Sequence, residues 1–257
     1  MTIIRPVPAF KDNYIWIGSN PATRLAFVVD PGEARPALDY LKEHDLDLTA
    51  ILLTHKHPDH TGGVAEILTH YPQAAVYAHP LDRVTAVTRE VNHGDKISVP
   101  GWPDEFTVLH IPGHTLGHVA YHTDKIVFSG DTLFAAGCGR VFEGTAAQML
   151  SSLQQLAALA PETLVYCGHE YTQANLKFAA VVEPQNQNVL QRAEVVEGLR
   201  AKGEVTLPSS IGLELKTNPF LRCGEGSVRG AVEAEVDKKL GDVVDVFHEL
   251  REWKNRF

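Results

Sequence analysis

The chain has 257 residues, of which 44% are hydrophobic and 21% charged, and its formal net charge is −9 at pH 7. These values are ordinary for a globular protein with one large domain, or one domain and a smaller appendage, and they exclude a disordered chain or a fibre. The negative charge argues against a nucleic-acid partner, because phosphate binding requires a basic surface. An anionic small molecule is not excluded, but it would need a local cluster of cations.

Nothing in the sequence predicts a membrane partner. No apolar run approaches the ~20 residues that a membrane span needs, and the first residues lack the basic and apolar regions of a secretory signal. The cysteines, Cys138, Cys167 and Cys223, are odd in number and far apart, which argues against a disulfide framework and fits a reducing compartment. We therefore expect a cytoplasmic protein, and we expect it to be a monomer.

The first 170 residues alternate between strand and helix signals. Short apolar runs rich in β-branched and aromatic residues predict strands at 14–17, 25–29, 76–78, 107–111, 119–122, 126–128 and 164–167. Apolar residues at helical spacing predict helices at 35–44 and 64–71, and a further helix after the N-cap Thr145. This alternation indicates an α/β domain over residues 1–170.

Helical signals dominate the rest of the chain. They cover residues 171–182, 189–201 and 228–240, and a last helix is expected to begin after the N-cap Asp242. Loop-forming residues interrupt these helices at 208–210 and 224–226. We therefore predict a second, smaller, all-helical domain over residues 171–257.

A dense group of potential metal ligands follows the apolar run at 50–53. The segment His55-Lys56-His57-Pro58-Asp59-His60 has the pattern H-x-H-x-D-H. Neutral imidazole is the commonest metal ligand in proteins, and carboxylate oxygen binds the same cations. A solvated polar loop is the less favoured alternative, because three histidines at this spacing seldom occur by chance.

Further potential ligands come directly after other predicted strands. His114, Asp131 and His169 each follow an apolar run and a turn that contains Gly or Pro. Side chains at the ends of neighbouring strands can converge on one point while the sheet holds them rigidly. The complete set of five His and two Asp is too large for one ion and right for two if one carboxylate bridges. We therefore predict a two-metal hydrolytic site without a thiolate ligand.

These motifs resemble those of the metallo-β-lactamase superfamily, whose fold is a four-layer αββα sandwich with the metals along one edge of the two sheets. Further segments resemble the glyoxalase II family, the hydroxyacylglutathione hydrolases: Asp12-Asn13-Tyr14 and the segments at 137–140 (GCGR), 143–145 (EGT), 168–172 (GHEYT), 218–222 (NPFLR) and 251–254 (REWK). The resemblance covers essentially the whole chain, including the helical C-terminal domain.

The resemblance divides the seven ligands between two divalent ions. It implies that His55, His57 and His114 bind one ion, that Asp59, His60 and His169 bind the other, and that Asp131 bridges them. The family uses zinc, iron or manganese, and ligands without sulfur suit all three. Zinc is the metal that we expect.

The implied reaction is hydrolysis of S-D-lactoylglutathione, and of related 2-hydroxyacylglutathiones, to D-lactate and glutathione, the second step of methylglyoxal detoxification. A hydroxide held between the two ions would attack the thioester, because bound water has its pKa lowered toward ~7. Asp131, which bridges the ions, and Asp59, which would also orient the hydroxide, are the catalytic residues expected. The thiolate leaving group departs without full protonation, so no separate general acid is needed.

Glutathione carries carboxylates, so an acidic chain must supply cations near them. By the resemblance, the residues that grip the glutathione moiety are Arg140, Tyr171, Arg251 and Lys254. Without the resemblance, Arg251 and Lys254 would be interpreted as a solvated helix end. Phe142, at the same part of the site, stands where many family members have a tyrosine, so a hydroxyl contact is missing there.

Other interpretations fit the sequence less well. A β-lactamase would be expected to have a cysteine in place of Asp131, and an RNA-processing nuclease is disfavoured by the net charge. A purely structural metal site would favour cysteine ligands and leave no open position. The nearest alternatives are a persulfide dioxygenase-like enzyme, which keeps one iron and fewer ligands, and another hydrolase of the same fold. His118 repeats the Gly-His pair of His114, but the resemblance favours His114, and His118 is expected to be structural.

Overall fold

The computed structural model describes residues 2–257. Two six-stranded sheets form its centre. The first has the strand order β1 (Ile3–Ala9), β2 (Asn13–Asn20), β3 (Leu25–Val29), β4 (Asp47–Leu52), β5 (Ala75–Ala78) and β6 (Arg89–Glu90). The second has the order β14 (Ser209–Ser210), β13 (Leu164–Cys167), β10 (Ile126–Gly130), β9 (Val119–His122), β8 (Phe106–His110) and β7 (Lys96–Ile97). A separate small hairpin pairs β11 (Leu133–Phe134) with β12 (Gly137–Cys138).

The two sheets share an apolar core. Phe27 of the first sheet makes edge-on contacts with Phe106 and Phe128 of the second, with ring centroids 5.5 and 5.9 Å apart. Edge-to-face packing is the favoured geometry for such rings. Because helices cover the other face of each sheet, several strands are buried on both sides and have continuous apolar sequences rather than alternating ones. This explains why the apolar runs were recognisable as strands.

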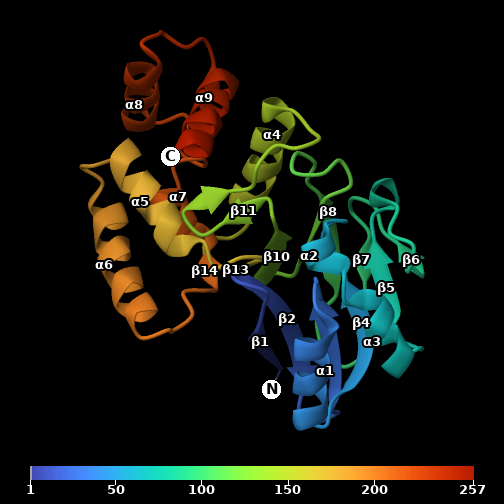
Figure 1. Cartoon of the computed structure of the whole chain (residues 1–257). Helices are drawn as coiled ribbons and strands as arrows, with labels where there is room; N and C mark the ends of the chain where they lie inside the picture. The colour runs from blue at the N-terminus through green and yellow to red at the C-terminus, as the bar shows by residue number, and fades with distance from the viewer. Residues whose placement is uncertain (1) are drawn as a thin grey trace.

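Helices cover the outer face of each sheet. On the first sheet lie α1 (Ala34–Glu43) and α3 (Val64–His70), which bury Leu41 and Ile67 against it. On the second lies α4 (Ala146–Ala157), which begins at a capping box formed by Thr145 and Gln148. The layer order is helix, sheet, sheet, helix (Figure 1). The predicted four-layer αββα fold is confirmed.

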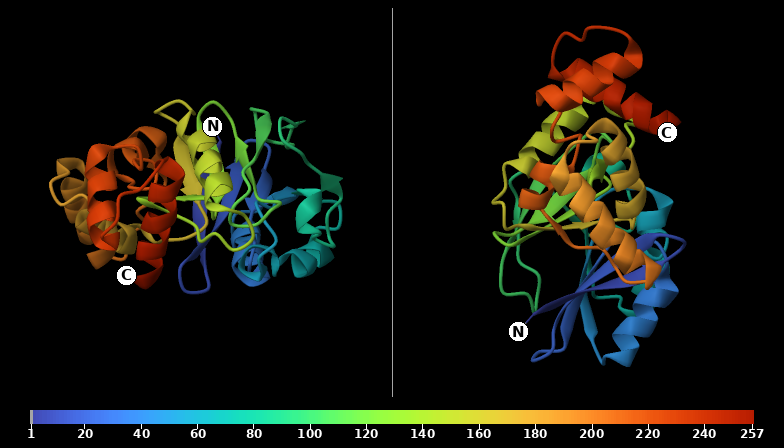
Figure 2. Two further views of the ribbon diagram at one scale, coloured as in Figure 1. Left: turned by 90° about the horizontal axis from the view of Figure 1, so that it is seen from above. Right: turned by 90° about the vertical axis from the view of Figure 1, so that its left-hand side faces the viewer.

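Five helices come after β13 in the chain: α5 (Thr172–Val182), α6 (Gln187–Ala201), α7 (Ile211–Thr217), α8 (Gly226–Val236) and α9 (Val243–Arg256). They gather on one side of the molecule, together with the C-terminus (Figures 1 and 2). The apolar faces of α5, α7, α8 and α9 join the core that underlies α4, where Phe178, Phe220 and Phe247 are fully buried, whereas α6 packs on α5 in a separate small cluster. α9 thereby packs against α4. None of the helices described over residues 2–257 is long and apolar enough to cross a membrane.

The structure differs from the sequence prediction in several places, and β6, β7, β11, β12 and α7 are among the elements that were not predicted. The loop predicted at 208–210 contains β14, which pairs with β13 and extends the second sheet, so the part after residue 170 is not wholly helical. Two residues are too few to produce a periodic signal, and the open edge of β13 supplies their hydrogen bonds. The helix predicted to reach residue 240 ends at Val236, where Asp237 adopts a left-handed conformation with φ of 49°. β1 was not predicted, because Pro6 and Pro8 argue against a strand. Both prolines are tolerated because β1 lies at the edge of its sheet.

Candidate active site

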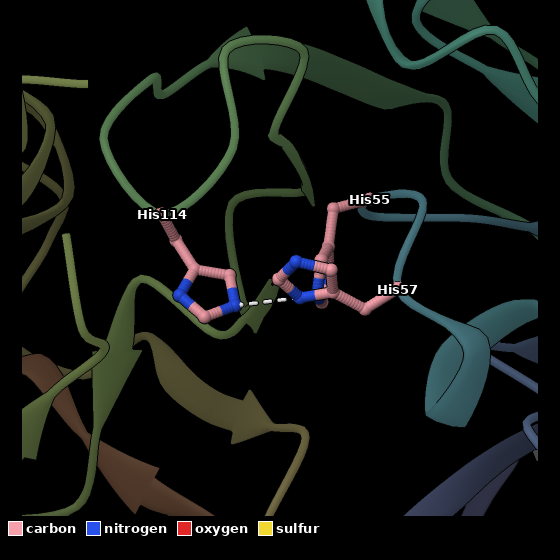
Figure 3. A group of neighbouring side chains, drawn as sticks. All are labelled: His55, His57 and His114. Atoms are coloured by element: carbon pink, nitrogen blue, oxygen red, sulfur yellow. Dashed lines mark hydrogen bonds between the residues drawn. The ribbon is translucent and has the colours of Figure 1, made fainter. Parts of the chain in front are cut away.

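Three imidazole groups from two loops converge at one end of the sheets. Nε2 of His55 and Nε2 of His114 each lie 3.0 Å from Nδ1 of His57 (Figure 3). His55 and His57 follow β4, whereas His114 lies in the loop between β8 and β9. Three imidazole nitrogens within 4.8 Å of one another form the kind of three-ligand set that binds a catalytic ion and leaves a position open.

A second group lies beside the first. It consists of Asp59 and His60, which the short helix α2 (Pro58–Thr61) carries, and His169, which follows β13. Oδ2 of Asp59 lies 3.6 Å from Nε2 of His60 and 3.5 Å from Nε2 of His169. Asn13 donates from Nδ2 to the same carboxylate oxygen at 3.1 Å, which holds Asp59 in place.

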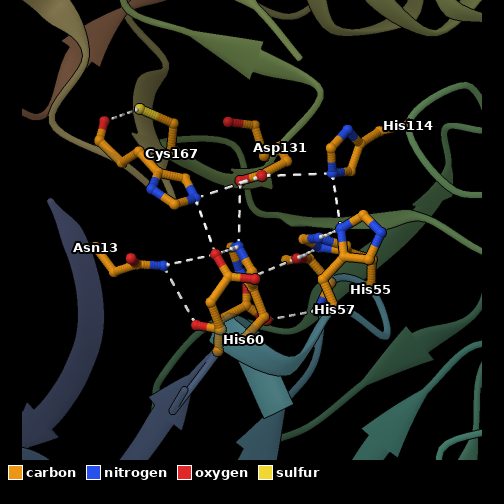
Figure 4. A network of polar contacts seen from close by, with 12 residues as sticks. Asn13, His55, His57, His60, His114, Asp131 and Cys167 are labelled. Atoms are coloured by element: carbon orange, nitrogen blue, oxygen red, sulfur yellow. Dashed lines mark hydrogen bonds and ion pairs between the residues drawn. The ribbon is translucent and has the colours of Figure 1, made fainter. Parts of the chain in front are cut away.

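Asp131 lies between the two groups (Figure 4). Its Oδ2 is 3.4 Å from Nε2 of His114 in the first group and 3.4 Å from Nε2 of His169 in the second. Its Oδ1 is 3.4 Å from Nε2 of His60. A single carboxylate therefore faces ligands of both groups, which is the placement that a bridging ligand requires.

The donor atoms fit divalent ions. Among the described residues, Nε2 of His60 and Oδ1 of Asp131 are buried without a hydrogen-bond partner. Buried polar atoms are nearly always paired, since leaving one unpaired costs about 1–3 kcal/mol. A cation between these nitrogen and oxygen donors would satisfy both atoms. The structure thus brings all seven predicted ligands into two adjoining groups suited to a dinuclear metal site.

Neighbouring residues orient the ligand histidines. In His55, His60, His114 and His169, Nδ1–H donates to a fixed acceptor, which leaves Nε2 free to face the centre; His57 instead faces the centre with Nδ1. The pairs are His60 with Oδ2 of Asp30 at 3.0 Å, His114 with the carbonyl of Arg140 at 2.8 Å, and His169 with Oδ1 of Asp12 at 2.9 Å. Thr54 donates its hydroxyl to Asp30 and accepts from Nδ1–H of His55 at 3.0 Å. His118 lies behind this set and accepts the backbone N–H of Asp131 at 3.1 Å.

The buried charged groups of the site shift one another's pKa values. Burial opposes the charge on Asp131, but His60 and His169 hold the pKa of this carboxyl well below its usual value. Burial likewise opposes a charge on His60, but Asp131 and Asp30 hold its pKa well above the usual value. A cation that binds Nε2 of His60 takes the place of this proton. Burial lowers the pKa of His55 far below its usual value, so its imidazole is a neutral ligand.

A cavity of about 440 Å³ opens onto the ligands. All five residues predicted for substrate binding line it: Arg140, Phe142, Tyr171, Arg251 and Lys254. Among the ligands, His57, Asp59, His114, Asp131 and His169 also line the cavity, whereas His55 and His60 are buried beneath it. The last helix and the loops at the sheet ends therefore contribute to one cavity of a size typical for small-molecule sites.

Arg251 is buried in the cavity wall. Its Nη1 donates to the carbonyl of Cys138 at 2.9 Å, Nη2 donates to Asn255 at 3.1 Å, and the guanidinium lies 5.1 Å from the ring centroid of Phe220. Its Nε is buried and has no partner among the described residues. The alternative interpretation of Arg251 as a solvated helix end is therefore wrong, because its side chain is fixed inside the protein.

Lys254 lies one turn further along α9 and is half-buried. Its Nζ donates to the carbonyl of Ala174 at 3.3 Å and lies 5.0 and 5.2 Å from the ring centroids of Phe178 and Phe257. Burial, together with the charge of Arg251, lowers the pKa of Lys254 to about 8. The cavity thus has a lysine whose charge changes near physiological pH.

Aromatic rings flank both metal groups. Tyr171 stacks on His169 with ring centroids 4.7 Å apart, and Phe134 contacts the same imidazole at 5.8 Å. Phe142 is 60% exposed and contacts His57 and His114 with centroid separations of 5.8 and 5.2 Å. All three aromatic side chains line the cavity.

Sequence reasoning missed the residues that support the ligands. Asp30 directly follows the strand at 25–29, as the ligands follow theirs, but it is not among the predicted site residues. Its position directly after a strand could have identified Asp30 as a site residue from the sequence. Asp12 and Asn13 had been noted only as part of a family motif, and nothing local in the sequence connects them with His169.

The comparisons with known proteins agree with this geometry. Residues 13–169 match the family model described as metallo-beta-lactamase superfamily, and residues 170–257 match that described as hydroxyacylglutathione hydrolase C-terminus. A Nitrosomonas eutropha protein named hydroxyacylglutathione hydrolase is 46% identical over 257 residues, which cover 100% of both chains.

Two solved structures extend the comparison. ETHE1 from Myxococcus xanthus aligns with a TM-score of 0.66 and 27% identity over 98% of each chain. TTHA1623 in a di-iron-bound form aligns with a TM-score of 0.60 and 26% identity over 85% of this chain and 99% of that chain. Together with the full-length relative, they confirm the resemblance found in the sequence. The chain belongs to the hydroxyacylglutathione hydrolase family of the metallo-β-lactamase superfamily.

Proposed function

We propose that this chain hydrolyses S-D-lactoylglutathione and related 2-hydroxyacylglutathiones to the 2-hydroxy acid and glutathione. One observation carries the proposal: a single cavity is lined both by five of the seven ligands and by the cations Arg251 and Lys254. The thioester would lie at the ligands while the glutathione carboxylates lie at the cations. The full-length relative named hydroxyacylglutathione hydrolase supports this assignment.

We propose zinc as the metal, with iron and manganese as alternatives, because imidazole and carboxylate donors without sulfur suit all three. The ions would be held by His55, His57 and His114 on one side and by Asp59, His60 and His169 on the other, with Asp131 shared. When bound, two such ions supply a water nucleophile of lowered pKa and polarise the thioester carbonyl.

The protein's own groups position the reactants. Asp59 is partly exposed to the cavity and is held by Asn13, so its second oxygen is free to accept a hydrogen bond from the attacking water and orient it. Asp131 stays ionised because the two histidines beside it lower its pKa. Arg251, Lys254, Tyr171 and the exposed Arg140 bind the glutathione moiety, which fixes the thioester relative to the ligands.

Cysteine chemistry has no place in this scheme. Cys138, Cys167 and Cys223 are all buried and free. Burial raises the pKa of Cys167 to about 12 and also raises that of Cys138. A buried thiol that stays protonated is not a nucleophile, so these side chains serve as small hydrophobic groups.

We propose that the boundary between a catalytic domain (1–170) and a substrate-binding domain (171–257) lies at Glu170. The two family models meet next to it, at residues 169 and 170. Strand β14 lies after this boundary in the chain, but it pairs with β13, which lies before the boundary. A cytoplasmic location and a monomeric state stay predictions from the sequence.

The substrate assignment can be tested by comparing two thioesters that share the D-lactoyl group. One is S-D-lactoylglutathione, and the other is the D-lactoyl thioester of N-acetylcysteamine, which lacks the glutathione carboxylates. We expect the metal-loaded protein to hydrolyse the first with a kcat/KM at least about a hundredfold higher, since two charge-assisted contacts are worth about 1.5–3 kcal/mol each. Equal rates would contradict the glutathione specificity, and a metal content of one ion per chain would favour the mononuclear alternative.

A further inference from the structure

A buried carboxylate outside the ligand set lies beside the first group of ligands. Asp82 is the last residue of the short 3₁₀ helix η1 (Pro80–Asp82) and is 5% exposed. The hydroxyl of Thr115 donates to its Oδ2 at 3.1 Å, and the backbone N–H of Gly117 donates to its Oδ1 at 3.0 Å. Both donors belong to the loop that carries His114. One carboxylate thus fixes this loop at two points.

The charge of Lys56, which lies between His55 and His57 in the other loop of the first group, also acts on this carboxyl. Burial raises the pKa of Asp82, and the hydroxyl of Thr115 and the charge of Lys56 offset this only in part. Among the described residues no cation lies within ion-pair distance of Asp82, and Nζ of Lys56 pairs with Glu143 at 2.7 Å. The two hydrogen bonds from the His114 loop are therefore the direct contacts that stabilise the buried carboxylate.

The backbone of Gly117 lies very close to the carboxylate of Asp82. A Cβ atom at this position would lie 2.4 Å from Oδ1 and 2.7 Å from Cγ of Asp82. These distances are far shorter than any side chain allows, so only glycine lets the backbone approach the carboxylate. Gly117, which precedes His118, is therefore required for the close contact with Asp82.

A second, outer contact joins the His114 loop to the His55–His57 loop. Glu143 pairs through Oε1 with Nζ of Lys56 and accepts the backbone N–H of Leu116 at its Oε2, at 2.7 and 3.0 Å. This pair is partly open to solvent, where an ion pair contributes little. The buried contact through Asp82 is therefore the stronger of the two.

We propose that Asp82 is a positioning residue that holds the His114 loop in place and so sets the geometry of the first metal group. The proposal rests on the proposed two-metal site. The second group has different supports, since Asp30, Asp12 and Asn13 hold its ligands. Loss of Asp82 should therefore weaken the binding of one ion and spare the other.

The test is the variant Asp82→Ala, with Asp95→Ala as its matched control. Asp95 also accepts a backbone N–H, that of Asn92 at 2.7 Å, but in an exposed turn. Zinc content and zinc dissociation constants would be measured for the full chain by elemental analysis and chelator competition. We expect the wild type and the control to bind two ions equally well, and Asp82→Ala to bind one of the two at least about tenfold more weakly, as for other residues that support ligands.

Two outcomes would overturn the proposal: wild-type affinity at both sites in Asp82→Ala, or equal weakening at both. Fewer than two ions in the wild type would instead overturn the proposed function. Hydrogen exchange of the metal-free chain gives an independent readout. We expect faster exchange in residues 113–118 of Asp82→Ala and unchanged exchange in 168–172, and unchanged exchange in both segments would also overturn the proposal.

A milder variant keeps the test decisive if Asp82→Ala does not fold. Thr115→Val removes one donor to Asp82 and preserves the shape of the side chain. We expect it to weaken the binding of the same single ion by about fivefold, because a net hydrogen bond is worth ~1 kcal/mol. Unchanged zinc binding at both sites in this variant would contradict the proposal.

Discussion

Nε2 of the buried His60 lies 3.4 Å from Oδ1 of Asp131, and neither atom has a hydrogen-bond partner among the described residues. Such a pair of unsatisfied atoms is unfavourable unless a cation joins them. Asp131 also faces His114 and His169. The arrangement makes Asp131 the one side chain on which both predicted ions depend.

The variant Asp131→Ala should therefore lose both metal and activity. We expect zinc content to fall from two ions per chain and kcat/KM to fall more than about a hundredfold, because even residues that only support ligands contribute 10–100-fold. Elemental analysis and the thioester assay measure the two effects. Asp124→Ala, in the exposed turn between β9 and β10, is the control and should match the wild type. Full retention of metal and activity in Asp131→Ala would show that the bridge is misassigned.

Arg251→Ala should act on substrate affinity rather than on the chemical step. The guanidinium lines the cavity away from the ligands, so we expect KM for S-D-lactoylglutathione to rise about tenfold or more while kcat changes less than threefold. The side chain also donates to the carbonyl of Cys138, so a lower Tm is expected as well.

Arg256→Ala provides the control for this variant. Arg256 is exposed on the same helix, and its removal changes the net charge equally without touching the cavity. An unchanged KM in Arg251→Ala, or an equal rise in both variants, would remove Arg251 from the glutathione site.

Affinity for glutathione derivatives should fall as pH rises through about 8. Lys254 has its pKa lowered to about 8 by burial and by Arg251, so it is a cation below this pH and neutral above it. A carboxylate ligand binds the cationic form better. Inhibition by S-methylglutathione, measured from pH 6.5 to 9, should weaken across this window.

The variant Lys254→Arg separates this effect from other titrations. Arginine keeps its charge over the whole range, so we expect its pH profile to be flatter than that of the wild type above pH ~8. The ligand's own amino group titrates equally in both experiments. Parallel profiles for the two proteins would rule out Lys254 as the titrating group.

Glu214 should be important for stability. It is fully buried, pairs with Arg192 at 2.7 Å, and accepts the backbone N–H of Ala136 at 2.7 Å. Glu214→Ala leaves a buried guanidinium without its partner, which typically costs about 3–5 kcal/mol in the free energy of unfolding. Urea unfolding measures the change, and Glu225→Ala, at an exposed position, serves as the control. A loss below about 1 kcal/mol would show that Arg192 finds other partners.

Much of the candidate site could be predicted because its ligands follow recognisable strands. His114, Asp131 and His169 come directly after apolar runs, and strand ends are where a sheet brings distant residues together. The division of the ligands into two groups required the resemblance, since spacing does not say which loops are neighbours. The contact of Asp12 with His169 spans 157 residues, and no local pattern connects such partners.

The fold was predictable to a similar degree and for similar reasons. Strands buried on both faces, such as β3 and β10, have continuous apolar sequences and were found. β14 was missed because its two residues become a strand only through pairing with β13. Asp82 also escaped notice, because its hydrogen-bond donors Thr115 and Gly117 lie 33 and 35 residues away in the sequence.

A zinc titration of activity tests most directly whether a two-metal site performs the hydrolysis. The chain is stripped of metal with a chelator, and hydrolysis of S-D-lactoylglutathione is measured as zinc is returned. We predict that activity is absent from the metal-free chain and reaches its maximum at two zinc ions per chain. No hydrolysis at full loading, or a maximum at one ion per chain, would contradict it.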